Sequence, residues 1–174
     1  EKSNIIIKTS DRLKLGLGFL TNIYQSKNGV IWIGASVKGL FSYNPITKEI
    51  KHHRNPLTPN QWINSFSNTI TEDSEGIIWY GNPVAGLIKF NPEKNEFTSY
   101  INIEKDEYSL SGNTVWPVYI DRSGVLWAGT NSSGINIWDR KKWKFNFIKY
   151  SRYDTSILSG SVINHIFEDI NNQI

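Results

Sequence analysis

Several aromatic and polar side chains are of the types that bind a hydroxylated ring. Trp62 and Trp116 offer flat apolar faces on which the CH face of a pyranose ring can stack. The residues that would complete such a site with hydrogen bonds and further aromatic contact are Arg54, Asn82, Tyr108, Asn131, Arg152 and Tyr153. We therefore expect a binding surface, and the elements of the fold must bring these residues together.

Sequence motifs for catalysis or metal binding are absent. The chain has no Cys, which removes disulfides, thiolate metal sites and cysteine nucleophiles together. His52 and His53 are adjacent in an extended segment and point to opposite faces, so they cannot share a ligand. No Ser-His-Asp spacing, glycine-rich phosphate loop or zinc motif stands out. We expect no catalytic residue, no cofactor and no metal site.

The charge of the 174 residues is mild. They carry 19 Lys and Arg against 16 Asp and Glu, for a net charge of +3, which does not require a nucleic-acid partner. The basic segment 141–144 fits a solvated turn in which a Trp covers apolar surface. No apolar run reaches the length of a membrane span. Because position 1 is not Met, we expect a piece of a longer product, which would reach the membrane only through its other parts.

An internal repeat organises the chain. Apolar-Trp-x-Gly runs recur at offsets of 47 and 48 residues, at Trp32 and Gly34, Trp79 and Gly81, and Trp127 and Gly129. The offset is constant within each copy, and the single inserted residue falls between Pro92 and Val118. Insertions confined to connectors are typical of repeated structural units. We therefore assign the recurring Trp and Gly residues to the core of the unit and not to a site.

Each unit is predicted to form four strands, A to D. In the second copy these are 66–72, 77–81, 86–91 and 97–101. Asp73 and Gly76 form the A–B turn, because Asp bonds its own downstream backbone and Gly adopts positive φ. Asn172 replaces the Gly in the fourth copy, and Asn also tolerates that conformation. Strand B is apolar at consecutive positions, which indicates burial on both faces between two blades of a β-propeller.

The predicted fold class is all-β, a β-propeller fragment of about three and a half four-stranded blades. The end of a preceding blade, with a strand at 5–9, and a connector occupy 1–22; the repeats occupy 23–69, 70–117 and 118–165; and 166–174 starts a fourth. Three and a half blades cannot close a ring of the usual four to eight. We expect the remaining blades of a longer protein, or a second copy of the chain, to cover the exposed edges.

The repeat resembles the two-component regulator propeller family. The resemblance rests on Ile70 to Asn91, Val118 to Asp139, and the segments 109–113 and 157–161. It implies the periplasmic sensor region of a Bacteroidetes hybrid histidine kinase. In that family two seven-bladed propellers precede a β-sandwich, a membrane span and a kinase. The implied role is to sense an oligosaccharide or related polysaccharide breakdown product, in a receptor expected to be a homodimer.

Comparison of equivalent positions in the repeat copies separates structural residues, which recur, from candidate binding residues, which do not. Asp73, Asp121 and Asp169 recur and are explained as turn residues. Trp116 is not demanded by the blade, because its counterparts are Thr21, Asn68 and Asn164. The D–A connectors and B–C loops of a propeller share one face of the ring, and the eight candidate residues lie on or beside these segments. We expect them on one face.

Three functions remain open at this point. The first is a ligand-binding sensor propeller that is not itself an enzyme. The second is a protein-interaction or dimerisation scaffold without a small-molecule site. The third is a propeller lyase or hydrolase, which would need a polar catalytic cluster that the sequence does not display.

Overall fold

The structure is a computed structural model that describes residues 18–54, 69–140, 144–151, 153 and 156–174. Its twelve strands form three four-stranded antiparallel sheets, and no helix is present among these residues. The first sheet contains β1 (Leu20–Gln25), β2 (Ile31–Ala35), β3 (Gly39–Tyr43) and β4 (Ile50–His53). The second contains β5 (Ile70–Glu72), β6 (Ile78–Asn82), β7 (Gly86–Asn91) and β8 (Glu96–Tyr100). The third contains β9 (Val115–Ile120), β10 (Leu126–Thr130), β11 (Ile135–Asp139) and β12 (Lys144–Ile148).

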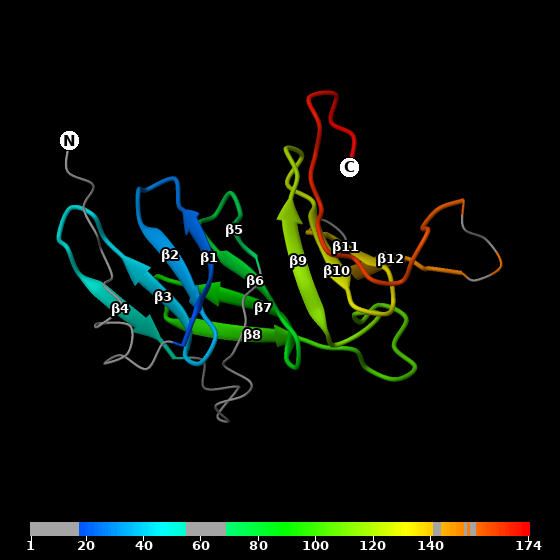
Figure 1. The fold of residues 1–174 in the computed structure, drawn as a ribbon, viewed down its shortest axis with the longest axis horizontal. Helices are drawn as coiled ribbons and strands as arrows, with labels where there is room; N and C mark the ends of the chain where they lie inside the picture. Colours follow the sequence, from blue (N-terminus) through cyan, green and yellow to red (C-terminus); the bar gives the residue numbers. More distant parts are fainter. Residues whose placement is uncertain (1–17, 55–68, 141–143, 152, 154–155) are drawn as a thin grey trace.

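Each sheet is a simple meander whose spatial order follows the sequence. The three sheets stand side by side in an open row (Figure 1). Their first strands meet at the inner edge, where β1 packs against β5, and β9 packs against β5 and β6. Gly81 of β6 allows this approach, since an added Cβ would lie 2.7 Å from the Val115 carbonyl oxygen. The predicted fold, an open set of four-stranded propeller blades, is confirmed.

The strands of the second repeat fall close to their predicted bounds. β7 agrees at both ends, while β6 and β8 differ from prediction by one residue. β5 begins at Ile70, and positions 66–68 lie outside the described residues. The strand expected at 5–9 also lies outside them. Segment 166–174 was expected to open with a strand, but it forms a turn without an assigned strand, because no described strand pairs with it.

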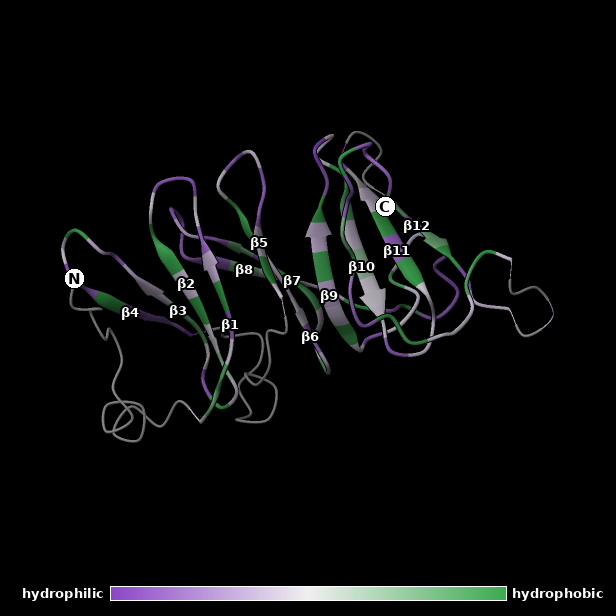
Figure 2. Ribbon diagram, turned by 45° about the horizontal axis from the view of Figure 1, so that its top comes forward, coloured by the Kyte–Doolittle hydropathy of each residue, from purple (hydrophilic) through white to green (hydrophobic). Residues whose placement is uncertain are grey.

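The core lies between the sheets. Trp32 and Leu40 of the first sheet pack with Ile78, Tyr80 and neighbouring residues of the second. Trp79 and Leu87, on the other face of the second sheet, pack with Leu126 and Trp138 of the third. Figure 2 shows the hydrophobic stretches of the strands that supply these residues. Strand β6 is buried at every position. Its two-sided burial explains why its sequence shows no alternation.

The Asp of each A–B turn binds the turn to the next strand. In Asp73, Asp121 and Asp169, Oδ1 accepts the backbone N–H groups two and four residues ahead. The second oxygen of Asp121 accepts the indole N–H of Trp127 at 2.8 Å, and Asp73 does the same for Trp79 at 3.1 Å. Asn172 has φ of 61°, as predicted for the residue that replaces Gly. The recurring Asp is therefore a turn residue, and in Asp73 and Asp121 it also accepts a hydrogen bond from a strand-B indole.

The first repeat achieves the same contact with a shorter side chain. Ser26 replaces the Asp, and its Oγ accepts the indole N–H of Trp32 at 2.7 Å. Asn28 supplies the turn acceptor instead, since its Oδ1 accepts the Val30 N–H at 3.1 Å. The bond to the indole is thus kept although the residue type changes.

None of the described residues forms a helix that is long and apolar enough to cross a membrane.

Candidate functional site

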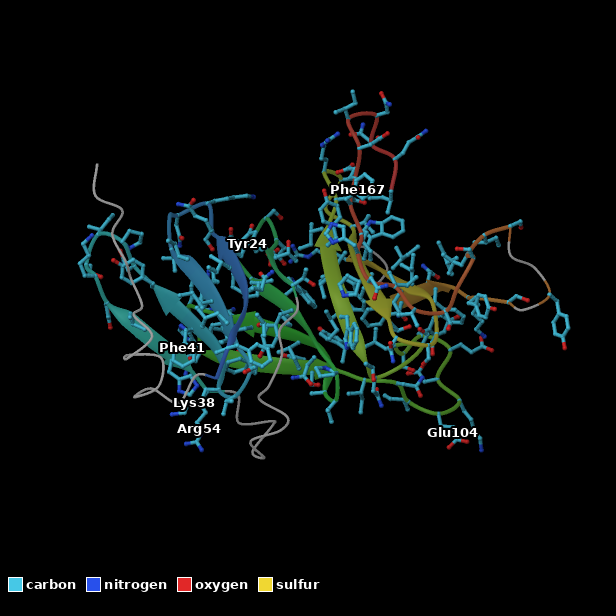
Figure 3. The ribbon with its side chains drawn as sticks, viewed as in Figure 1. Tyr24, Lys38, Phe41, Arg54, Glu104 and Phe167 are labelled. Atoms are coloured by element: carbon cyan, nitrogen blue, oxygen red, sulfur yellow. The ribbon has the colours of Figure 1, made fainter. Side chains whose placement is uncertain are left out.

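The connector between β8 and β9 lies beside the β6–β7 and β10–β11 turns at one end of the sheets. The Asn131 N–H, in the β10–β11 turn, donates to the Thr114 carbonyl oxygen at 3.0 Å. Thr114 Oγ1 in turn donates to the Pro83 carbonyl oxygen in the β6–β7 turn, also at 3.0 Å. In Figure 3 Lys38, Arg54 and Glu104 mark this end of the molecule, and Tyr24 and Phe167 lie toward the other. We call it the connector face.

Three candidate residues lie on or near the connector face around the third sheet. Tyr108 is half exposed in the connector after β8, where its carbonyl oxygen accepts the Phe145 N–H at 3.3 Å. Asn131 is exposed in the β10–β11 turn. Trp116 is partly buried in β9, and its carbonyl oxygen accepts a bond of 2.8 Å from Thr69 Oγ1. The innermost strand therefore presents Trp116 at the inner edge of the row.

The remaining candidates are distributed differently. Asn82 is only 3% exposed, and its Oδ1 accepts the N–H groups of Val84 and Ala85, both at 2.8 Å. Asn82 thus shapes the β6–β7 turn. Arg54 is exposed after β4, and Tyr153 is fully exposed. Trp62 and Arg152 lie outside the described residues.

Two adjoining hollows open on the connector face beside the third sheet. The larger, of about 520 Å³, is lined by Asn102–Ser111 except Tyr108, and by Ser132, Ser133, Phe147, Lys149 and Tyr150. The smaller, of about 410 Å³, brings Tyr108 beside Phe145 and Phe147. They share Glu107, Phe147 and Lys149. We call the pair the connector cavity. It joins the surroundings of Tyr108 to the turn that contains Asn131.

Phe147, Lys149 and Tyr150 were missed by sequence reasoning. Their repeat counterparts in the second copy are Ser99, Ile101 and Asn102, so all three break the pattern. Lys149 Nζ lies 4.6 Å from the Phe147 ring centroid, and the two form one amphipathic wall. A departure from the repeat, the signal that marks Trp116, therefore also marks these three residues at the end of strand D.

Hydrogen bonds stiffen the connector that lines the cavity. Asp106 Oδ1 accepts the Tyr108 N–H at 2.9 Å, and Ser109 Oγ accepts the Ile103 N–H at 2.9 Å. Asn136, fully buried in β11, accepts the Ser111 N–H at 2.8 Å and donates to Ser111 Oγ at 3.0 Å. Leu110 between them is fully buried. The cavity wall is therefore held in place before any ligand arrives.

The chemistry of the connector cavity suits a polyhydroxylated molecule. Aromatic rings, hydroxyls, carboxylates and the two ammonium groups of Lys105 and Lys149 offer apolar faces, donors and acceptors in one concave surface. Among the described residues, no three His, Asp or Glu side chains lie together so that they could hold a metal ion. The arrangement supports binding and orientation of a ligand.

A family model described as the two component regulator propeller matches residues 109–132. The match runs from the stiff part of the connector through β9 and β10 into the β10–β11 turn. The resemblance read from the repeat is therefore confirmed on the segment that borders the connector cavity. No curated protein sequence matches the chain.

Solved structures share the fold. The extracellular domain of BT4673 from Bacteroides thetaiotaomicron, titled as that of a hybrid two component system, superposes with a TM-score of 0.70 at 21% identity, covering 88% of this chain and 19% of that one. That of BT3049, similarly titled and from the same organism, gives 0.63 at 22% identity, covering 85% and 21%. Virginiamycin B lyase from Staphylococcus aureus gives 0.60 at 17% identity, covering 78% and 42%. The present chain thus spans about a fifth of the length of the two extracellular domains.

Proposed function

We propose that the chain is part of the extracytoplasmic sensor propeller of a hybrid two-component histidine kinase, in a periplasmic position. The observation that carries this proposal is the overlap of two features. The segment matched by the regulator propeller family, 109–132, is the one that supplies Ser109, Ser111 and Ser132 to the connector cavity. The shared fold with extracellular domains of two component systems supports it.

The proposed ligand is an oligosaccharide or a related breakdown product of a polysaccharide. Tyr108, Phe147 and Tyr150 provide rings for the CH faces of sugar units. Serine hydroxyls and the carboxylates of Glu104 and Glu107 provide partners for the hydroxyls. A hollow of this size accommodates a few sugar units and leaves the rest of the chain in solvent. The proposal assigns no catalytic step to the chain.

The test is ligand-induced thermal stabilisation of the 174-residue chain by a panel of hexasaccharides, namely cellohexaose, xylohexaose and maltohexaose. One member should raise the melting temperature by roughly 5 °C at a hundredfold excess over its dissociation constant. Tyr108→Ala and Tyr150→Ala, which remove rings that line the connector cavity, should reduce this shift while leaving the unliganded melting temperature nearly unchanged. Phe167→Ala, which removes an exposed ring at the opposite end, is the matched control.

A scaffold without a small-molecule site is the second candidate. It is favoured by exposed apolar side chains on the connector face, such as Val84, Ile101 and Ile103, which a protein partner or a second copy in a receptor dimer could cover. If no hexasaccharide stabilises the chain, this second function replaces the first. If the aromatic variants unfold without ligand, the rings are structural and the proposed site is wrong.

A further inference from the structure

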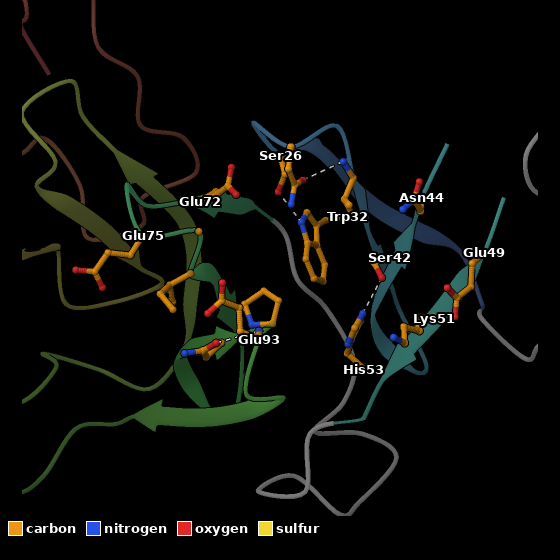
Figure 4. Close-up of a pocket in the computed structure, with 16 residues that line it drawn as sticks. Ser26, Trp32, Ser42, Asn44, Glu49, Lys51, His53, Glu72, Glu75 and Glu93 are labelled. Atoms are coloured by element: carbon orange, nitrogen blue, oxygen red, sulfur yellow. Dashed lines mark hydrogen bonds between the residues drawn. The ribbon is translucent and has the colours of Figure 1, made fainter. Parts of the chain in front are cut away.

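A second cavity lies at the other end of the sheets, between the first and the second. It measures about 490 Å³ and is bordered by the β1–β2, β3–β4, β5–β6 and β7–β8 turns. Figure 4 shows Trp32, Ser42 and His53 on one wall, with Glu72 and Glu93 on the facing wall. We call it the interblade cavity. It shares no lining residue with the connector cavity.

The repeat shows that the blades do not require this cavity. Between the second and third sheets the equivalent space shrinks to about 20 Å³. The residues that fill it include Lys89, Tyr100 and Arg140. Their repeat counterparts in the first interface are Ser42, His53 and Pro92, each with a smaller side chain. These three substitutions therefore open the interblade cavity.

In the filled interface the chain's own cations occupy the space beside the strand-B tryptophan. Lys89 Nζ lies 5.7 Å from the Trp79 ring centroid. The Arg140 guanidinium pairs with Glu75 at 2.5 Å and with Asp73 at 3.5 Å. In the first interface, Ser42 and Pro92 bring no charge to the corresponding places beside Trp32. In the filled interface, the chain thus places its own ammonium and guanidinium groups at this position.

The charges that line the interblade cavity favour a cation. Glu49, Glu72 and Glu93 face it against the single ammonium group of Lys51, and the fourth carboxylate, Glu75, is already paired with Arg140. Burial, and next the charge of Lys51, lower the pKa of His53 to about 4, so its ring is neutral at physiological pH. Excess negative charge beside an aromatic ring attracts an ammonium group.

A buried hydroxyl in the cavity wall points to an oxygen atom on the ligand. Ser26 is 5% exposed and lines the cavity, and its Oγ accepts the Trp32 indole N–H at 2.7 Å. Among the described residues, no acceptor takes the hydroxyl proton of Ser26. A buried donor without a partner is costly, and a ligand oxygen within reach would satisfy it.

We propose that the interblade cavity binds a small hydroxylated amine, of which an amino sugar is the type. Its ammonium group lies between Trp32 and the carboxylates of Glu72 and Glu93, and one of its oxygens accepts the Ser26 hydroxyl. The Ser42–His53 bond of 2.7 Å and the packing of His53 against Trp32 and Phe90 hold the wall in shape. This site is independent of the one proposed on the connector face.

The test is a titration of the ¹⁵N-labelled 174-residue chain with D-glucosamine, followed through the indole N–H signal of Trp32. We expect a saturating shift of this signal. D-glucose, which has the same ring but no charge, should bind at least about fivefold more weakly. Equal responses to both sugars would refute the cation site, and no response to glucosamine would overturn the proposal. Signals of Tyr108 and Asn131 report separately on the connector cavity.

Substitutions locate the binding. Pro92→Arg places a guanidinium where Arg140 stands in the next interface, and it should weaken glucosamine binding by about tenfold or more. Glu93→Gln removes one exposed carboxylate and should weaken it by about fivefold. Glu104→Gln removes a matching exposed carboxylate in the connector cavity and should leave binding unchanged. If Glu104→Gln weakens it as much as Glu93→Gln, the attraction is a general charge effect and the assigned site is wrong.

Discussion

At the scale of single residues, one carboxylate or hydroxyl in each of the three described blades links the A–B turn to the indole of strand B. Asp73 and Asp121 accept backbone N–H groups with one oxygen and a strand-B indole with the other, and Ser26 keeps the indole bond alone. A buried indole N–H without an acceptor would cost more than the bond itself contributes. Asp73 and Asp121 therefore have two roles, one in the turn and one as acceptor for the indole. The sequence predicted only the role in the turn.

The first prediction concerns Asp121. Burial acts to raise its pKa, but the bonds from Ser123, Trp127 and Val125 outweigh this effect, and the pKa lies below the ordinary Asp value. A carboxyl with a lowered folded-state pKa contributes stability above its unfolded-state pKa and loses it as pH falls through the folded one. Asp121→Ala should cost about 1–2 kcal/mol at neutral pH, measured by urea unfolding.

Its control comes from the chain's own first repeat. Asp121→Ser keeps an acceptor for the Trp127 indole, as Ser26 does for Trp32, and should cost clearly less than Asp121→Ala. Both variants should lose less stability than the parent chain on acidification below about pH 4. Equal costs for Ser and Ala would show that the indole bond contributes nothing.

The second prediction concerns His53. Its pKa is lowered from 6.5 to about 4 in the folded chain. Between these two pH values the His53 ring therefore takes up a proton in the unfolded chain but stays neutral in the folded chain. Stability should therefore fall as pH drops from 6.5 towards 4. For a group that keeps partial solvent contact, we expect a loss of up to about 2 kcal/mol.

His53→Phe should remove that contribution to the pH dependence, as measured by thermal melting across the range. His52→Phe, on the same strand but exposed, is the matched control and should leave the contribution of His53 in place. An unchanged pH profile in His53→Phe would mean that another group is responsible.

At the scale of elements, strands and turns were predictable and the shape of the connectors was not. The burial pattern of a strand can be predicted from the strand's own residues. β6 and β7 could be placed because consecutive apolar positions indicate a strand that is buried on both faces. The connector cavity depends on contacts between distant segments, such as the bond from Ser111 N to Asn136 Oδ1. Asn136 carries no local signal of that role. Sequence reasoning therefore reached Tyr108 and missed Phe147.

The carboxylates that join neighbouring blades illustrate the same limit. Glu72 Oε2 accepts the Lys27 N–H at 3.0 Å, and Glu168, its counterpart two repeats on, accepts the Arg122 N–H at 3.1 Å. The interface between the second and third sheets uses Arg140 instead. This difference between the interfaces is seen only when equivalent positions of the repeat are compared together with their contacts.

The third prediction compares two glycines of one blade. Gly124 and Gly134 have φ of 84° and 82°, so any side chain strains the backbone at both. An added Cβ meets nothing near Gly124 but overlaps the Ile148 carbonyl oxygen at Gly134. Gly124→Ala should cost about 1 kcal/mol. Gly134→Ala should cost about 2 kcal/mol more, because strand β12 must shift.

Urea unfolding of the two variants side by side measures the difference directly. If they lose equal stability, the close approach of β12 to the β10–β11 turn is not rigid, and the outer wall of the connector cavity is less firmly held than these contacts require.

At the scale of the whole molecule, three packed sheets leave apolar side chains uncovered. Phe167 and Ile170 are 67% and 89% exposed near the third sheet, and Ile103 and Tyr108 are half exposed on the connector face. Surfaces of this kind promote association. The fourth prediction is that light scattering finds pairs of the isolated 20.0 kDa chain, near 40 kDa. A stable species at 20 kDa would show that these side chains do not drive association.

The function that we propose requires the connector face to bind a small ligand. The measurement that tests it most directly is a titration of the ¹⁵N-labelled chain with the hexasaccharide panel, followed residue by residue. We expect saturating shifts at Tyr108, Asn131 and Tyr150, with little change at Ser26 or Trp32 in the interblade cavity. Shifts confined to the interblade cavity, or none with any member of the panel, would contradict it.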